Sequence, residues 1–227
     1  MIRICASIAE KNRKNCIRAI SAAKKLGASL AEIRIDYLDR DEEIPKIIHE
    51  SSLPLIVTNR NKKEGGKFKG SEEERINNLL DAIDAGCGFV DIELNTEEKL
   101  REKIIKLAKR NKCKVIASVH VFNKTPDLRI LNKLLNEERK IADIGKIVTF
   151  GNRIEDTAKN FNLLKTASSV NFPLITFAMG NLCRFSRIAA PLFGSYLTYA
   201  SIGKPSAAGQ FSIKEMVDFY KKLGVNI

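Results

Sequence analysis

KVIASVHVFNKTPDLRILNKLLNEERKIADIGKIVTF, residues 114–150, contains two short apolar runs separated by a stretch with helical character. The runs at 114–122 and 144–150 are rich in Val and Ile, which favours β-strands. Thr125 followed by Pro126 predicts a helix start, because threonine suits the N-cap and proline suits the first helical position. A strand, a helix and a second strand in this order predict a βαβ unit with two parallel strands.

The same unit recurs along the whole chain. Eight strand-like runs begin between residues 3 and 196, at a mean spacing of about 28 residues, which is enough for a strand, a helix and two short loops. The runs are RICASI at 3–8, LAEIRIDYL at 30–38, LPLIVTNR at 53–60, FVDIEL at 89–94, KVIASVHVF at 114–122, IGKIVTF at 144–150, PLITFAM at 173–179 and YLTYASI at 196–202. The pairs Ser71–Glu74, Asn95–Glu98 and Ser212–Glu215 have capping-box spacing and predict further helix starts.

Eight consecutive strand and helix units predict one fold class: an α/β protein forming a single (β/α)8 barrel domain over residues 1–227. An open doubly wound sheet typically has five or six strands, so it is the weaker alternative. A dinucleotide-binding domain would need a glycine fingerprint after the first strand, and CASIAEKNRKN contains no glycine.

Composition narrows the functional class. With 44% hydrophobic residues the chain reads as globular, and no apolar run approaches the roughly 18 to 20 residues of a membrane span. The chain opens without a long hydrophobic leader segment, so we expect a cytoplasmic protein. Five cysteines stand far apart without a CxxC pair, and two histidines cannot build a His-rich metal centre, so we expect reduced thiols and no metal.

The net charge of +12 is spread over many segments. The chain has no Trp, zinc-finger pattern or RRM-type aromatic motif, so a solvated lysine-rich exterior explains the charge better than a nucleic-acid surface. A basic protein that binds nucleic acid through its lysines stays open as an alternative from a different functional class.

Polar and charged residues occupy alternating positions near the carboxyl ends of several predicted strands. A barrel interior is normally filled by branched apolar side chains, so these positions require an explanation. They could point outward between helices or form ion pairs that merely close the barrel. As a set they predict a catalytic face at the carboxyl ends of the strands. The residues are Glu32, Arg34, Asp36, Thr58, Arg60, Asp91, Glu93, Ser118, His120 and Lys146.

Lys146 and His120 are the strongest candidates for catalytic residues. Burial inside a strand and neighbouring positive groups would lower the pKa of Lys146 toward a nucleophilic amine, so we predict a Schiff base there. His120 is the only strand-borne imidazole and can carry a proton near neutral pH if a carboxylate such as Glu93 orients it. His49, in KIIHE, is expected on an exposed helix.

Three loops after predicted strands add binding candidates. Arg187, in RFSRIAAPLFG at 184–194, can hold a carboxylate bidentately, although a surface role is the alternative. Gln210 ends the small-residue loop PSAAGQ at 205–210, which can close over a site or simply lead into the last helix. NRNKKEGGKFKG at 59–70 is basic and glycine-rich, so it is either a mobile anion-attracting loop or a solvated one.

Over essentially its full length, the chain resembles the type I 3-dehydroquinate dehydratases, the Schiff-base family of the shikimate pathway to aromatic amino acids. The matching motifs are EIRID at 32–36, TNR at 58–60, VDIEL at 90–94, SVHVFNKTP at 118–126, ADIGKI at 142–147, ITFAMG at 175–180, SRIAAPLFGS at 186–195 and PSAAGQ at 205–210. The resemblance implies a (β/α)8 barrel that converts 3-dehydroquinate to 3-dehydroshikimate and water by syn elimination, with no metal or organic cofactor.

The resemblance also implies residue roles and partners. Lys146 would form the imine with the C3 ketone, and His120, held by Glu93, would remove the C2 proton and help the C1 hydroxyl to leave. The small-molecule substrate is the expected partner, with no nucleic acid and no membrane. Family members are often dimers, so a homodimer is implied, although the residues do not fix the oligomeric state. The implied substrate-binding residues are Arg187, Ser206 and Gln210 for the carboxylate, Glu32, Arg34 and Arg60 for the ring hydroxyls, and Ser7, Met179 and Phe193 for the pocket wall.

Two positions depart from the family pattern. Val121 stands where the family commonly has Asp after the catalytic His, and Phe177 stands where it has the first Met of a pair. Neither departure removes a proton carrier. The nearest alternative activity is that of another Schiff-base barrel, an aldolase acting on sugar phosphates, which would favour a phosphate cradle after the last two strands.

Overall fold

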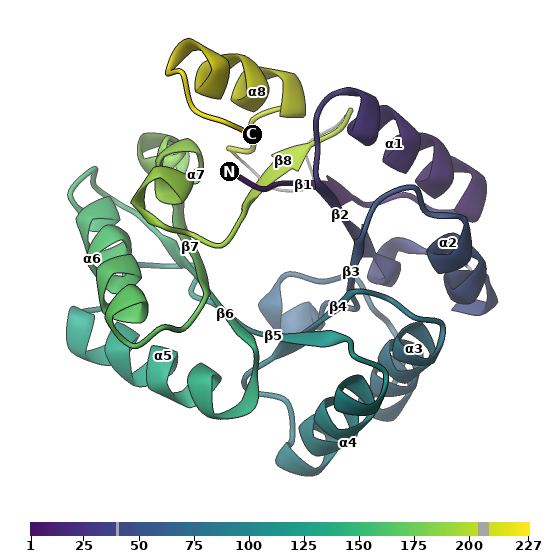
Figure 1. The fold of residues 1–227 in the computed structure, drawn as a ribbon. Coiled ribbons are helices and arrows are strands. Elements are labelled where there is room, and N and C mark those ends of the chain that lie inside the picture. The colour runs from purple at the N-terminus through teal and green to yellow at the C-terminus, as the bar shows by residue number, and fades with distance from the viewer. Residues whose placement is uncertain (40, 204–208) are drawn as a thin grey trace.

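Eight parallel strands follow one another around a barrel in the computed structural model, which describes residues 1–39, 41–203 and 209–227 (Figure 1). The strands are β1 Ile4–Ile8, β2 Leu30–Arg34, β3 Leu55–Thr58, β4 Phe89–Glu93, β5 Lys114–His120, β6 Ile144–Phe150, β7 Leu174–Met179 and β8 Thr198–Ser201. The α-helices are α1 Arg13–Lys25, α2 Ile44–Glu50, α3 Glu72–Asp84, α4 Glu98–Arg110, α5 Leu128–Ile141, α6 Asp156–Ser169, α7 Ser186–Ala189 and α8 Ile213–Lys222. None of the described helices is long and apolar enough to cross a membrane.

The barrel nearly closes on itself. Each strand from β1 to β6 pairs in parallel with the next along the chain, and β1 also pairs with β8. Between β7 and β8, the backbone N–H of Tyr196 donates to the carbonyl of Leu174 over 2.8 Å. The helices form an outer ring around the strands (Figure 1). The predicted (β/α)8 architecture is confirmed.

Two of the predicted helix starts are confirmed in detail. The Ser71 hydroxyl accepts from the backbone N–H of Glu74, whose carboxylate accepts from the backbone N–H of Ser71. Ser212 and Glu215 form the same capping box at α8. Each box satisfies two backbone donors that an uncapped helix start would leave without partners.

Two other helix starts lie further along the chain than predicted. Asn95 does not cap α4, which begins at Glu98, because the preceding turn is held instead by Arg101, whose guanidinium donates to backbone carbonyls of that turn. Thr125 does not cap α5, which begins at Leu128. The Thr125 hydroxyl instead contacts the end of β6, where the Phe150 carbonyl lies 3.0 Å away.

The barrel interior changes from apolar to polar along the strands. Its lower layer, near the amino ends, is an apolar cluster of Cys5, Leu30, Ile56, Ile116, Ile144, Ile175 and Leu197. Side chains two residues further along a strand point to the same face. The residues at these positions are Ser7, Glu32, Thr58, Ser118, Lys146, Phe177 and Tyr199. The period-2 pattern therefore places a largely polar layer above the apolar one, at the carboxyl ends of the strands.

Two polar residues that the sequence placed on strands lie just beyond them. Asp36 belongs to the short 3-10 helix η1, Ile35–Tyr37, and Arg60 follows the end of β3 at Thr58. The ladder of β2 ends at Arg34, and the Asp36 carboxylate beyond it accepts two hydrogen bonds from Arg34 and a third from the backbone N–H of Lys67.

Candidate active site

Lys146 stands at the centre of the polar layer. It lies on β6, is only 4% exposed, and its Nζ donates to Asp91 Oδ2 over 2.9 Å and to Glu32 Oε1 over 3.3 Å. The sequence predicted positive neighbours for this amine, but the two hydrogen-bond partners that it has among the described residues are both carboxylates. The aromatic face of Tyr199 lies on another side, with Nζ 4.4 Å from the ring centroid.

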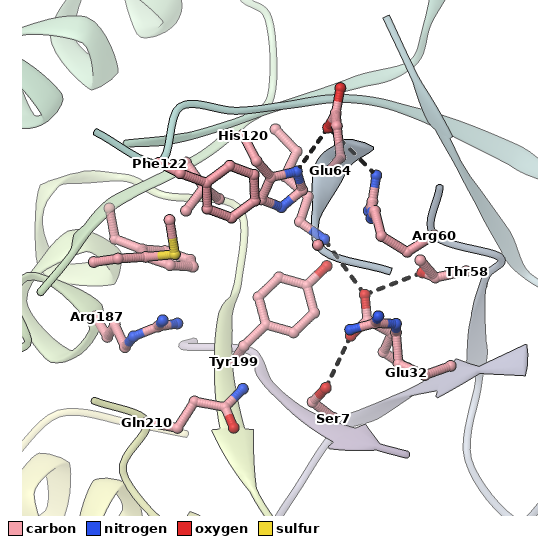
Figure 2. Close-up of a pocket in the computed structure, with 16 residues that line it drawn as sticks. Ser7, Glu32, Thr58, Arg60, Glu64, His120, Phe122, Arg187, Tyr199 and Gln210 are labelled. Atoms are coloured by element: carbon pink, nitrogen blue, oxygen red, sulfur yellow. Dashed lines mark hydrogen bonds and ion pairs between the residues drawn. The ribbon is translucent and has the colours of Figure 1, made fainter. Parts of the chain in front are cut away.

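The two carboxylates around Lys146 are themselves held in place. Glu32 accepts from the hydroxyls of Ser7 over 2.9 Å and Thr58 over 3.0 Å (Figure 2). Asp91 accepts from Ser118 over 2.6 Å and from Arg60 over 2.7 Å. The polar residues of neighbouring strands thus form one buried network inside the barrel, and the alternative that these side chains point outward is wrong for them.

The pKa of Asp91 shows how this network stabilises charge. Burial alone would raise it, but Arg60 and Lys146 hold the pKa of this carboxyl well below its ordinary value. Asp91 therefore stays ionised at neutral pH and gives the amine a fixed negative neighbour.

His120 meets a carboxylate other than the one predicted. Its Nδ1 lies 2.9 Å from Oε2 of Glu64, which follows β3 in the short 3-10 helix η3, Lys62–Glu64 (Figure 2). Glu93 instead pairs with Arg75 over 2.7 Å and with Arg60 over 3.2 Å. The prediction that Glu93 holds the imidazole directly is wrong, because two buried arginines and a backbone N–H occupy its oxygens.

Glycines in the loop after β3 bring Glu64 to the imidazole. Gly65 adopts a left-handed conformation at φ 78°, which suits glycine and ends η3. A Cβ on Gly66 would lie 1.7 Å from the Arg60 carbonyl oxygen, so only glycine permits this close return of the loop. The sequence signal was present: Glu64 is the one acidic residue in NRNKKEGGKFKG, and it directly precedes the pair Gly65 and Gly66.

The pKa values of His120 and Glu64 are both shifted from their ordinary values. Burial, reinforced by Arg60 and Lys146, holds the pKa of His120 well below its ordinary value, so the imidazole is neutral near pH 7. Burial, with Glu93 and Asp91 adding to it against the opposing effect of Arg60, raises the pKa of Glu64 to about 7. A neutral imidazole with one nitrogen held by a carboxylate can act as a base through the other nitrogen.

Arg187 differs from the other buried cations of the site. It lies in α7, the short helix after β7, and is 2% exposed. Among the described residues it has no carboxylate partner, and its Nε has no hydrogen-bond partner. Its guanidinium carbon lies 4.2 Å from the ring centroid of Phe177. Burial lowers the pKa of Arg187 to about 10, so it remains positive at neutral pH. A cation of this kind is suited to hold an anionic ligand group.

Most of the predicted site residues line one cavity. Figure 2 shows them converging from different strands and loops on the space around Tyr199. The cavity is lined by Ser7, Glu32, Arg34, Thr58, Arg60, Glu64, Gly65, His120, Phe122, Lys146, Val148, Phe177, Met179, Arg187, Tyr199 and Gln210.

Three predicted residues are placed elsewhere. Phe193 is 58% exposed and stacks on Phe161 of α6 at 4.4 Å between centroids, so its prediction as a pocket residue is wrong. Glu93 lies outside the lining, on the far side of the Glu64 and His120 pair, where it lines a neighbouring cavity. Ser206 lies outside the described residues.

Tyr199 and Phe122 were missed as pocket residues. Tyr199 sits in the predicted run YLTYASI, two residues after Leu197 of the apolar layer, so period-2 alternation could have placed it in the polar layer. Phe122 stacks on His120 at 6.0 Å between centroids, just beyond the end of β5. It stands two residues after His120 within the predicted run at 114–122, so the same alternation could have placed it beside the site.

A buried amine and a neutral imidazole facing one cavity can perform imine chemistry with proton transfer. The amine supplies a nucleophile for a carbonyl carbon, and the imidazole supplies a base beside it. Arg187, which has no carboxylate partner among the described residues, adds a place for a carboxylate on the same substrate.

Comparison with known proteins agrees with this chemistry. The family model described as Type I 3-dehydroquinase matches residues 4–227. The chain is similar to 3-dehydroquinate dehydratases from Methanococcus maripaludis, at 36% identity over 97% of this chain and 100% of that one, and from Methanothermobacter thermautotrophicus, at 35% identity over 93% and 92%. The crystal structure of the type I 3-dehydroquinate dehydratase from Clostridium difficile, with covalent modified comenic acid, has a TM-score of 0.89 at 26% identity, covering 98% of this chain and 92% of that one. The chain therefore belongs to the type I 3-dehydroquinase family, which confirms the predicted enzyme class, a hydro-lyase.

Proposed function

We propose that the chain dehydrates 3-dehydroquinate to 3-dehydroshikimate and water through a Schiff base on Lys146. The observation that carries the proposal is the meeting of the buried Lys146 amine and the neutral His120 imidazole in one cavity. The presence of covalent modified comenic acid in the related Clostridium difficile enzyme supports covalent chemistry with a small acid.

The imine supplies the electron sink for the elimination. The Lys146 nitrogen attacks the C3 carbonyl carbon, and loss of water gives an iminium that acidifies the hydrogens on C2. His120 removes one C2 proton and returns it to the departing C1 hydroxyl, so water leaves from the same face. Hydrolysis of the product imine then frees the amine.

Orientation of the base falls to Glu64 in this account. Its ionised carboxylate accepts a hydrogen bond from the Nδ1–H of His120, which leaves Nε2 as the basic nitrogen. Glu93 acts one step further away, because it fixes Arg60, which in turn holds Asp91 beside the amine.

The substrate carboxylate is assigned to Arg187 and Gln210. Arg187 is buried in the cavity wall without a carboxylate partner among the described residues, and Figure 2 shows Gln210 on the same side of Tyr199. Ser206 remains a predicted third contact. Glu32 and Arg60 lie across the cavity from Arg187 (Figure 2). Together with Arg34, another lining residue, they would face the ring hydroxyls, and Ser7 and Met179 complete the wall.

The biological setting follows from the reaction. Formation of 3-dehydroshikimate places the enzyme in the shikimate pathway to aromatic amino acids, in the cytoplasm. Residues 1–227 would act as one catalytic barrel domain, without metal or organic cofactor, and assemble as a homodimer.

Turnover tests the proposal directly. The wild-type chain is incubated with 3-dehydroquinate and, separately, with a sugar phosphate, and Lys146→Ala is compared with Lys106→Ala, which changes an exposed lysine. We expect 3-dehydroshikimate from the wild type and Lys106→Ala, and a loss of at least about a thousandfold in Lys146→Ala. Cleavage of the sugar phosphate without dehydration would favour the aldolase alternative and contradict the proposal.

A further inference from the structure

Tyr199 occupies a position that the proposed mechanism has not used. It lies on β8, is 3% exposed, and stands in the middle of the cavity between His120, Glu32 and Arg187 (Figure 2). Its ring is fixed by burial and by an edge-to-face contact with Phe177 at 6.5 Å between centroids. Lys146 Nζ lies over the face of this ring, 4.4 Å from the centroid.

The three contacts of Lys146 Nζ respond differently when the amine becomes an imine. An ammonium group has three N–H donors and can serve both Asp91 and Glu32. A protonated imine keeps one N–H, so at least one of these two hydrogen bonds must be lost. Attraction to the face of an aromatic ring depends on the positive charge and not on the number of N–H groups. The ring contact can therefore persist through the change.

We propose that the aromatic face of Tyr199 is a catalytic contact that stabilises the positively charged imine nitrogen on Lys146. This inference rests on the proposed Schiff base. In that step the nitrogen lone pair forms the bond to the C3 carbon, and the carbonyl oxygen leaves as water after accepting two protons. One of these protons comes from the nitrogen and one from the surrounding acids, and the nitrogen then carries the positive charge that the ring faces.

The hydroxyl of Tyr199 is separable from this role. Among the described residues it has no hydrogen-bond partner, so Tyr199→Phe removes the hydroxyl without breaking a bond in the structure. Phenylalanine keeps a ring of nearly the same shape and a similarly negative face. Tyr199→Phe is therefore the matched control for variants that change the face itself.

Two further variants test the face. Tyr199→Leu removes the ring, and incorporation of pentafluorophenylalanine at position 199 keeps the shape but reverses the electrostatic sign of the face. The readouts are the fraction of chain trapped by borohydride with 3-dehydroquinate, kcat and KM. We expect both face variants to lose about tenfold in trapped imine and in kcat relative to Tyr199→Phe, which keeps the ring face.

The outcomes distinguish a wrong role for the Tyr199 ring from a wrong proposed function. Equal trapping and kcat in the Phe and pentafluorophenylalanine variants would overturn the inference, because a merely packing ring would tolerate the fluorinated one. A loss in Tyr199→Phe as large as in the other two variants would overturn it as well, by assigning the effect to the hydroxyl. If the wild type forms no trapped imine, the proposed function is itself wrong and the inference falls with it.

Discussion

Glu64 Oε2 lies 2.9 Å from His120 Nδ1, although the two residues are 56 positions apart and Glu64 belongs to a loop that follows a different strand. The carboxylate reaches the imidazole because two glycines fold the loop back over Arg60. The orientation of the base thus depends on a loop, while the base itself and the reacting amine are held on strands.

Glu64→Gln tests whether this contact orients the base. The amide oxygen accepts a hydrogen bond from Nδ1–H more weakly than a carboxylate does. The amide NH₂ group can also donate to Nδ1, which would favour the tautomer with the proton on Nε2 and remove the base. We expect kcat to fall about tenfold to a hundredfold with KM nearly unchanged. Glu97→Gln, at an exposed position beside the neighbouring cavity, is the control and should behave as wild type. An unchanged kcat in Glu64→Gln would assign the orientation to another group.

The pH dependence of turnover follows from the same pair. The pKa of Glu64 is about 7, so its carboxylate is ionised above this pH and protonated below it. We expect kcat/KM to fall as the pH drops through about 7, because protonated Glu64 no longer fixes the basic tautomer of His120. In Glu64→Gln this step near pH 7 should be absent, and a step that persists in the variant would point to a different titrating group.

The free energy of unfolding should fall as the pH rises, whereas kcat/KM should rise. The pKa of Glu64 is raised in the folded chain from an ordinary 4.5, so the folded state holds more protons than the unfolded state between about pH 4.5 and 7. The contribution of this group is fully present below pH 4.5 and lost as the pH rises through about 7. Urea unfolding of wild type and Glu64→Gln at pH 5 and pH 8 checks this: the loss on going to pH 8 should be smaller in the variant.

Gly66→Ala tests the role of the loop in placing Glu64. A Cβ at this position would lie 1.7 Å from the Arg60 carbonyl oxygen, so the loop must move and carry Glu64 away from His120. We expect kcat to fall at least as far as in Glu64→Gln. Gly88→Ala is the control, since a Cβ there meets its nearest atom at an ordinary 3.6 Å. Full activity in Gly66→Ala would show that the loop position is unimportant.

Arg187→Met separates binding from stability. The guanidinium is buried without a carboxylate partner among the described residues, so its removal breaks no ion pair with them, and we expect the free energy of unfolding to stay nearly unchanged. KM for 3-dehydroquinate should rise at least about tenfold, because the substrate carboxylate loses its cation. Arg75→Met should show the reverse pattern, with a large loss of stability, because Arg75 pairs with both Glu72 and Glu93. Unchanged KM in Arg187→Met would contradict its role.

Alternation along strands made much of the site predictable from sequence. Glu32 and Lys146 lie two residues beyond apolar interior positions on their strands, so their convergence follows from strand geometry and the barrel topology. The position of Glu64 could not be obtained in this way, because it depends on the backbone path of a glycine-containing loop. The prediction of Phe193 as a pocket residue is wrong for a similar reason, because the backbone path of the 3-10 helix Ala190–Phe193 turns its ring outward onto Phe161.

The imine on Lys146 is the central claim, and one measurement addresses it most directly. The wild-type chain is mixed with 3-dehydroquinate and reduced with sodium borohydride. Its intact mass is then measured by mass spectrometry, and the modified residue is located by peptide mapping. The account predicts one reduced adduct per chain, located on Lys146 and absent from Lys146→Ala. Formation of 3-dehydroshikimate without any adduct, or an adduct on a different lysine, would contradict it.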